Sequence, residues 1–196
     1  MAAADPVTLC ETGPLIVVLG PSGSGKDTLM SFARSELAGR DDVLFVRRAI
    51  TRPADAGGED HLPMTDLEFD AAIDRGAFSL TWAANGLRYG LPRAIEKHLA
   101  LGKPAIVNGS RGAWGVIRQV FPSAVAVEIR VERSILAQRL QSRGRESAAE
   151  IEARLARAAM LETGFEADVV IDNSGSLERA GLALVGYLTQ RADVRS

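Results

Sequence analysis

The sequence GPSGSGK, from Gly20 to Lys26, follows a short apolar run and decides the fold. That run, LIVVL at 15–19, is rich in β-branched residues and is typical of a buried parallel strand. A helical pattern follows the glycines as far as about Leu37. The spacing G-x-x-x-x-G-K between a strand and a helix is that of a P-loop, whose backbone N–H groups surround phosphate oxygens at a helix N-terminus. The sequence therefore predicts a site for nucleotide phosphates.

The residues expected to hold ATP in this loop run from the first glycine into the helix. They are Gly20, Pro21, Ser22, Gly23, Ser24, Gly25, Lys26, Asp27 and Thr28. Lys26 is expected to reach the β and γ phosphates, and Thr28 a phosphate nearer the ribose. Asp27 stands where a Ser or Thr normally binds Mg²⁺. It either meets the metal, directly or through water, or is a solvated first-turn carboxylate favoured by the helix dipole.

Beyond the loop, apolar runs and turn residues alternate in a regular order. Strands are predicted at 43–46, 78–84, 87–89, 105–107, 125–131 and 169–171, and helices at 65–74, 92–101, 113–121, 134–142, from 147 and from 176. Thr65 with Glu68, and Ser147 with Glu150, have capping-box spacing. Asn85-Gly86 predicts a tight hairpin turn. The segment 48–63, with its prolines and glycines, is predicted to be a loop.

This order predicts an α/β fold of the P-loop NTPase type, with three αβα layers around a parallel central sheet. A small antiparallel insert and a helical lid are added to it. Residues 1–13 are expected to form an extension, and 14–196 a single kinase domain. Within that domain, about 48–90 is assigned to acceptor binding and about 139–157 to the lid.

The composition is that of a soluble globular protein with near-balanced charge. Lys and Arg number 23 and Asp and Glu 25, for a net charge of −2, so a nucleic-acid partner is not expected. The single cysteine, Cys10, excludes an intrachain disulfide. Apolar runs are too short for a membrane span. These features indicate a cytoplasmic protein with a small-molecule substrate.

Arginines gather in the segment that breaks at Arg143-Gly144. They are Arg133, Arg139, Arg143, Arg145, Arg154 and Arg157. Phosphoryl transfer needs cations around the migrating group, so Arg139, Arg143 and Arg154 are predicted, with Lys26, to be catalytic. The alternative is a solvated helix face, with Glu146, Glu150 and Glu152 as partners.

The ordered motifs of the chain resemble those of guanylate kinases. They are the P-loop, Thr51-Arg52-Pro53, Asp60-His61 with Phe69, Trp82-Ala83 with Tyr89-Gly90, and Arg143-Gly144. The resemblance covers roughly residues 13–190. It implies that Arg52 and Tyr89 bind the acceptor phosphate, with His61 where a Tyr is usual, and that Asn173 lies near adenine.

The positions that bind guanine in that family differ here. Their polar residues fall at Arg48, Thr81, near Leu91, and at Asn108 or Ser110, which leaves no carboxylate for the base. A site that loses such partners loses selectivity for the base. Added cations at Arg48, Arg88 and Arg111 imply a second anionic group on the acceptor. The predicted acceptor residues are therefore Arg48, Arg52, His61, Arg88, Tyr89, Asn108, Ser110 and Arg111.

The complete pattern, including Val107-Asn108-Gly109-Ser110-Arg111, is similar to that of ribose 1,5-bisphosphate phosphokinases of phosphonate degradation. This resemblance implies that ATP phosphorylates ribose 1,5-bisphosphate to 5-phospho-α-D-ribosyl 1-diphosphate (PRPP), leaving ADP. Two alternatives remain: a nucleoside-monophosphate kinase of altered specificity, and a non-catalytic guanylate-kinase-like binding module. The oligomeric state is not indicated by the sequence.

Overall fold

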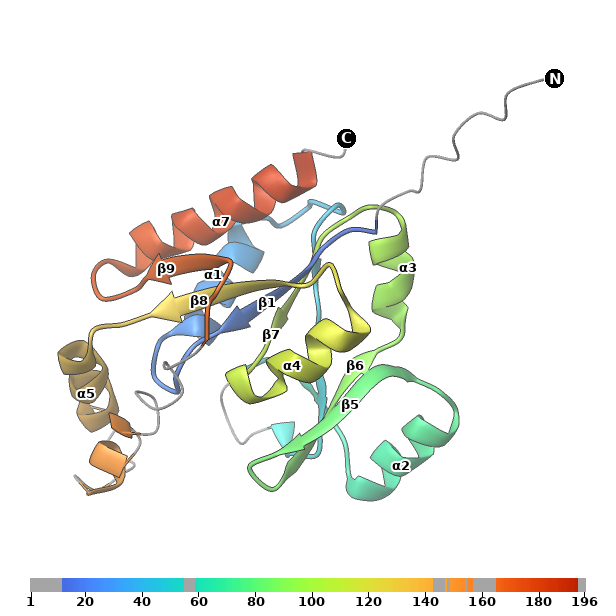
Figure 1. The fold of residues 1–196 in the computed structure, drawn as a ribbon, viewed down its shortest axis with the longest axis horizontal. Helices are drawn as coiled ribbons and strands as arrows, with labels where there is room; N and C mark the ends of the chain where they lie inside the picture. Colours follow the sequence, from blue (N-terminus) through green and yellow to red (C-terminus); the bar gives the residue numbers. More distant parts are fainter. Residues whose placement is uncertain are drawn as a thin grey trace.

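The computed structural model describes residues 12–54, 59–142, 147, 149–153, 155–156 and 165–193. Its central sheet is parallel throughout, with the strand order β2-β7-β1-β8-β9 (Figure 1). The strands are β1 (Leu15–Leu19), β2 (Leu44–Phe45), β7 (Ala105–Asn108), β8 (Val125–Arg130) and β9 (Val169–Asp172). The predicted parallel sheet is confirmed, and β1 at its centre is buried along its whole length.

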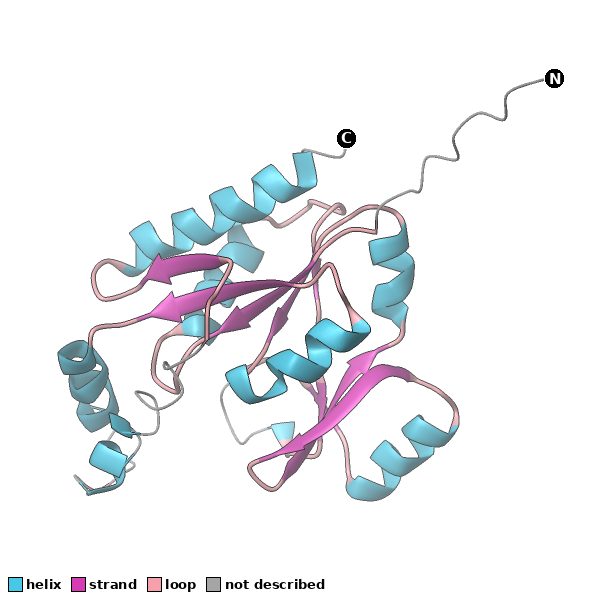
Figure 2. Cartoon of the chain, viewed as in Figure 1, coloured by secondary structure: helices cyan, strands magenta, loops and turns pink. Residues whose placement is uncertain are grey.

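Helices cover both faces of this sheet, as Figure 2 shows. They are α1 (Lys26–Glu36) and α7 (Leu177–Asp193) on one face, and α3 (Ala94–Ala100) and α4 (Arg111–Val120) on the other. A further helix, α5 (Arg133–Ser142), follows β8 and lies beyond the end of the sheet (Figure 1). Alternate residues of β1 point to opposite faces. Ile16 and Val18 pack in a core with α1 and α7, whereas Leu15, Val17 and Leu19 pack in a second core with α3 and α4. The predicted three-layer αβα architecture is confirmed.

A second sheet carries the insert and differs from the expectation. Its order is β4-β3-β6-β5, built from β3 (Ala49–Ile50), β4 (Leu62–Pro63), β5 (Phe78–Ala84) and β6 (Leu87–Pro92). The hairpin β5–β6 is antiparallel, but β3 and β4 are parallel, so the sheet is mixed. The segment 48–63, predicted to be a loop, supplies two of the strands. Its pairing of Ala49 with Gly90 joins distant parts of the chain, which local turn residues do not reveal.

Local signals predicted one helix start and one turn correctly. Thr65 forms the expected capping box with Glu68 at the start of α2 (Asp66–Asp74). Asn85 and Gly86 have φ values of 53° and 74°, as a tight hairpin turn requires. Pro92 does not begin a helix, however. It pairs with Phe78 at the end of β6, and the next residue, Arg93, donates its N–H to the Ala77 carbonyl.

The arginine-rich segment is described only in part. α5 packs through Leu136 and Leu140 against Ile151 and Leu155 of the following helical segment. Ser147 and Glu150 form the predicted capping contacts, with the Ser147 N–H 2.8 Å from the Glu150 carboxylate. Arg143, Arg145, Arg154, Arg157 and Glu146 lie outside the described residues, as does most of the predicted extension.

The other end of the predicted extension belongs to the folded part. Gly13 is buried and donates its N–H to the Leu99 carbonyl at 2.7 Å. In the described part of the chain, every helix is too short or too polar to cross a membrane.

Alanine at Gly181 is expected to destabilise the protein by about 1–3 kcal/mol, the usual cost of overpacking. The added Cβ would lie 2.4 Å from the Phe32 ring of α1, which packs against α7. Gly186→Ala on the same helix is the matched control, since nothing lies within 4 Å of its new Cβ. Helix propensity should make that variant more stable by up to about 1 kcal/mol. Urea unfolding followed by circular dichroism measures both, and equal effects would contradict this account.

Candidate active site

The phosphate loop follows the carboxyl end of β1, and a hydrogen bond from Asn173 holds it in place. The Asn173 side-chain amide donates to the Ser24 carbonyl at 2.7 Å, and Arg139 donates to the Asn173 carbonyl at 2.9 Å. Gly25, the residue before α1, has a φ of 83°. That conformation strains any L-residue with a Cβ, and here a Cβ would also lie 2.6 Å from the Asn173 amide nitrogen. The loop thus has the open backbone that a phosphate group requires.

Asp27 and Asn108 meet beside this loop. The Asn108 amide donates to Asp27 Oδ1 at 2.6 Å. The other atom of that amide, Asn108 Oδ1, is buried and has no hydrogen-bond partner among the described residues. Oxygen donors suit Mg²⁺, which takes one or two protein ligands together with phosphates and water. These two residues therefore fit a nucleotide-bound magnesium ion, although no cluster of three or more potential metal-ligating side chains occurs in the described part of the chain.

A single cavity of about 610 Å³ joins the phosphate loop to the insert. It lies where the carboxyl ends of the parallel strands meet the second sheet. Its lining comes from three regions: Gly20–Gly23 and Gly25–Thr28 of the loop and α1, then Arg48, Ile50, Arg52, Glu59, Trp82, Ala84, Asn85 and Tyr89 of the insert, and finally Asn108–Gly112, from the last residue of β7 into α4. Six of the eight residues predicted to bind the acceptor line it, together with the loop predicted to bind ATP.

Arg48 is held on the insert side of the cavity by three neighbours. Its guanidinium binds Glu59 through two nitrogens, at 2.6 and 3.0 Å. It also lies 4.9 Å from the ring centre of Tyr89 and 5.6 Å from that of Trp82. These two rings stack on each other, with centres 5.3 Å apart. Glu59 therefore supplies a carboxylate that the sequence comparison of guanine-binding positions did not anticipate, and Arg48 already engages it.

Arg111 lies on the opposite side, in the first turn of α4. Ser110 caps this helix, and the Arg111 side chain binds Glu128 of β8. Glu128 accepts a second hydrogen bond from Arg130, at 2.8 Å. Burial alone would raise the pKa of the Glu128 carboxyl, but the hydrogen bonds from Arg111 and Arg130 outweigh burial and hold that pKa below its usual value. Glu128 is therefore an ionised group inside the protein.

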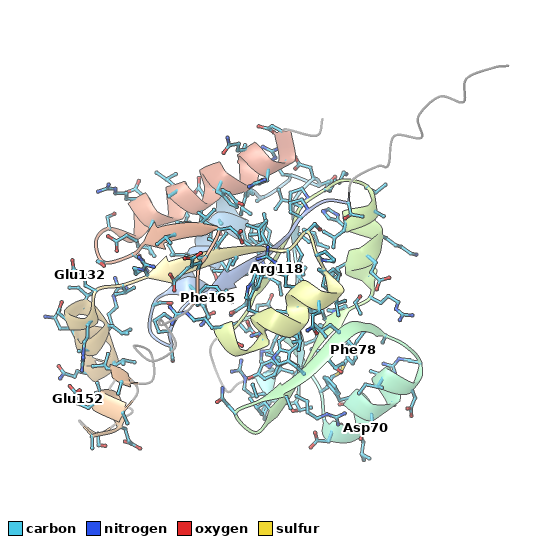
Figure 3. All side chains as sticks on the ribbon, in the orientation of Figure 1. Asp70, Phe78, Arg118, Glu132, Glu152 and Phe165 are labelled. Atoms are coloured by element: carbon cyan, nitrogen blue, oxygen red, sulfur yellow. The ribbon has the colours of Figure 1, made fainter. Side chains whose placement is uncertain are left out.

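Two predicted acceptor residues do not line the cavity. His61 is buried, and its ring nitrogens lie 3.1 Å from the Arg52 carbonyl and 3.3 Å from an Arg52 guanidinium nitrogen. Arg88 points to α2, where it binds Asp70 at 2.7 Å and covers the Phe69 ring. Figure 3 shows Asp70 on the insert, at the end of the molecule opposite Glu152. His61 thus supports Arg52, and Arg88 ties the hairpin to α2.

The predicted catalytic residues lie in different surroundings. Lys26 lines the cavity. Arg139 instead donates a hydrogen bond to the carbonyl of Asn173, whose side chain holds the phosphate loop. Arg143 and Arg154 lie outside the described residues. Arg133 forms an exposed ion pair with Glu152 at 3.1 Å, as the alternative of a solvated helix face predicts.

Sequence reasoning missed Trp82, Glu59 and Glu128. Trp82 belongs to a family motif but was given no role in the site, and Glu59 lies in the segment predicted to be a loop. Glu128 did carry a signal, because it is the one acidic residue in the apolar strand 125–131. An acid inside a buried strand needs a cationic partner, which points to a buried arginine.

A P-loop after the central strand of a parallel sheet, facing an inserted second sheet, defines a class of small-molecule kinases. The family model for guanylate kinase matches residues 12–190. The chain therefore belongs to the guanylate kinase family. The solved guanylate kinase of Anaplasma phagocytophilum has the same fold, with a TM-score of 0.68 at 19% identity over 93% of this chain and 87% of that one.

Two relatives are much more similar in sequence to this chain than that guanylate kinase is. A ribose 1,5-bisphosphate phosphokinase of Desulfomicrobium baculatum is 47% identical over 176 residues, which covers 90% of this chain and 94% of that protein. The protein of the same name from Pseudomonas paraeruginosa is 48% identical over 178 residues, covering 90% and 96%.

Mg·ATP is expected to raise the melting temperature of the wild type, and Gly25→Ala is expected to abolish this rise. The added Cβ would displace the Asn173 amide that holds the phosphate loop, so the loop would lose the shape that binds phosphate. Gly39→Ala is the matched control. Gly39 has a similar φ of 89°, but nothing lies within 4 Å of the added Cβ. Both variants should lose about 1 kcal/mol to backbone strain, while only Gly39→Ala keeps the protection. Full protection of Gly25→Ala would show that the loop tolerates the side chain.

Proposed function

We propose that the protein transfers the γ-phosphoryl group of ATP to ribose 1,5-bisphosphate, forming 5-phospho-α-D-ribosyl 1-diphosphate and ADP. The observation that carries this proposal is the shared cavity, whose lining includes Arg48, Arg52 and Arg111 together with the phosphate loop. An acceptor with two phosphates needs cations at more than one place. The names of relatives with 47% and 48% identity agree with such an acceptor.

In this proposal, the triphosphate of ATP binds the backbone N–H groups of the loop and Lys26. Asp27 and Asn108 would hold Mg²⁺, which when bound neutralises charge on the phosphates. Arg52, Tyr89 and Arg111 hold the acceptor. An oxygen of one acceptor phosphate forms the new bond to the γ-phosphorus, and the bond between that phosphorus and the bridging oxygen of ADP breaks. The attacking oxygen is already anionic, so no general base is needed.

Catalysis then consists of positioning and charge stabilisation. Arg139, Arg143 and Arg154 are proposed to neutralise the transferring group. To contact that group, Arg139 would have to give up its hydrogen bond to the Asn173 carbonyl. If it keeps this bond, it acts indirectly, because Asn173 holds the phosphate loop.

Membership of the guanylate kinase family favours one other acceptor, a nucleoside monophosphate. The contacts of Arg48 argue against it. The guanidinium lies over Trp82 and Tyr89, the aromatic rings on which a planar base would stack, and it engages the Glu59 carboxylate. A base would have to displace an arginine that has two aromatic contacts and two hydrogen bonds.

The function is tested by coupled ADP release with Mg·ATP and separate offers of ribose 1,5-bisphosphate, GMP and AMP. Turnover is expected with the sugar bisphosphate alone, and phosphorus NMR should show a diphosphate on the product. Turnover with GMP and none with the sugar would overturn the proposal and assign the cavity to a nucleotide.

Lys26→Ala is expected to lower turnover at least about a thousandfold, since it removes the cation that contacts the transferring phosphate. Lys26 is partly exposed in the cavity, so the fold should remain intact. Circular dichroism and unfolding midpoint check the fold, and the coupled assay checks the rate. Near-normal turnover by the variant would remove the phosphate loop from the mechanism.

A further inference from the structure

Glu128 is an ionised side chain buried at the carboxyl edge of the central sheet. It lies on β8, between Val127 and Ile129, and 2% of it is exposed. In the sheet register it stands beside Leu19, the last residue of β1 before the phosphate loop. A carboxylate in such a place loses its hydration, which only close cationic or hydrogen-bonding partners offset.

Its two partners differ in where they lie. The Arg130 side chain is 58% exposed and has solvent around it. The Arg111 side chain is 8% exposed, lines the cavity, and lies near the ring of Phe165. Glu128 therefore joins a surface cation, Arg130, to a cation of the cavity that the phosphate loop also lines, Arg111.

Stability alone does not account for this arrangement. A buried ion pair usually adds little to stability compared with apolar side chains of similar volume. An unattached arginine has many rotamers, and ordering it on a ligand costs free energy. An arginine already fixed by a carboxylate avoids that cost. Because a guanidinium has five N–H donors, it can bind Glu128 and a phosphate oxygen together.

We propose that Glu128 is a positioning residue, which fixes the Arg111 guanidinium for a phosphate group of the acceptor. The proposal rests on the proposed function, because it takes Arg111 as a binding group for the sugar bisphosphate. Glu128 does not touch the substrate. It acts only through Arg111.

The direction in which one substitution changes the acceptor KM distinguishes three possible roles of Glu128. Glu128→Gln keeps the shape of the side chain and removes its charge. If Glu128 acted only through its electric field, losing a negative charge would favour the anionic acceptor and lower its KM. If its role were only structural, stability would change and KM would not. Positioning predicts a higher acceptor KM.

The experiment measures KM for ribose 1,5-bisphosphate and for ATP in the wild type, Glu128→Gln, Arg111→Ala and the double variant. Glu128→Gln should raise the acceptor KM about tenfold, as expected for weakening one charge-assisted contact, and leave the ATP KM within about twofold. In the Arg111→Ala background the same change should add nothing, because the group that Glu128 positions is gone.

Arg130→Ala is the matched control, since it removes the exposed partner and keeps the bond between Glu128 and Arg111. Its acceptor KM should stay within about twofold of the wild type. An unchanged or lower acceptor KM for Glu128→Gln overturns the proposal, as does an equal increase with and without Arg111. Wild-type protein that does not use the sugar bisphosphate overturns the proposed function instead, and with it this role.

Discussion

The active site depends on the register of three buried parallel strands, β7, β1 and β8. β1 pairs Val18 with Asn108 of β7 on one side and Leu19 with Glu128 of β8 on the other. Both polar residues therefore lie level with the start of the phosphate loop, at the carboxyl edge of the sheet. A shift of one residue in either strand would send that side chain to the opposite face of the sheet. The apolar packing of β1 thus sets the positions of Asp27 and Arg111 through their bonds to Asn108 and Glu128.

Charge in the cavity is organised in pairs. Arg48 with Glu59 on the insert, and Arg111 with Glu128 behind the sheet edge, are both largely buried. Each carboxylate offsets the cost of keeping a guanidinium away from water before an anion arrives. Each pair also lowers the net positive charge of the cavity. The site therefore combines fixed donors for phosphate oxygens with a modest electric field, which favours geometric selection of the acceptor over non-specific attraction of anions.

Local sequence signals predicted the parts of the fold that depend on neighbouring residues. The phosphate loop, the Thr65 capping box and the Asn85-Gly86 turn were all found where the sequence indicated them. Contacts between distant segments were not predictable in this way. The pairing of 49–50 with the hairpin, and the bonds that turn His61 and Arg88 away from the cavity, depend on tertiary packing. For the same reason, family motifs located the cavity, but they did not reveal which arginines already have carboxylate partners.

His61 connects the two arginines of the insert. Its ring contacts the backbone carbonyls of both Arg52 and Glu59, and Glu59 in turn holds the Arg48 guanidinium. The two cations thus belong to one hydrogen-bonded unit that joins residues 48 and 52 to residues 59 and 61. Their contributions to acceptor affinity are consequently not separable, and evolution of a different acceptor preference at this wall would have to change the group together.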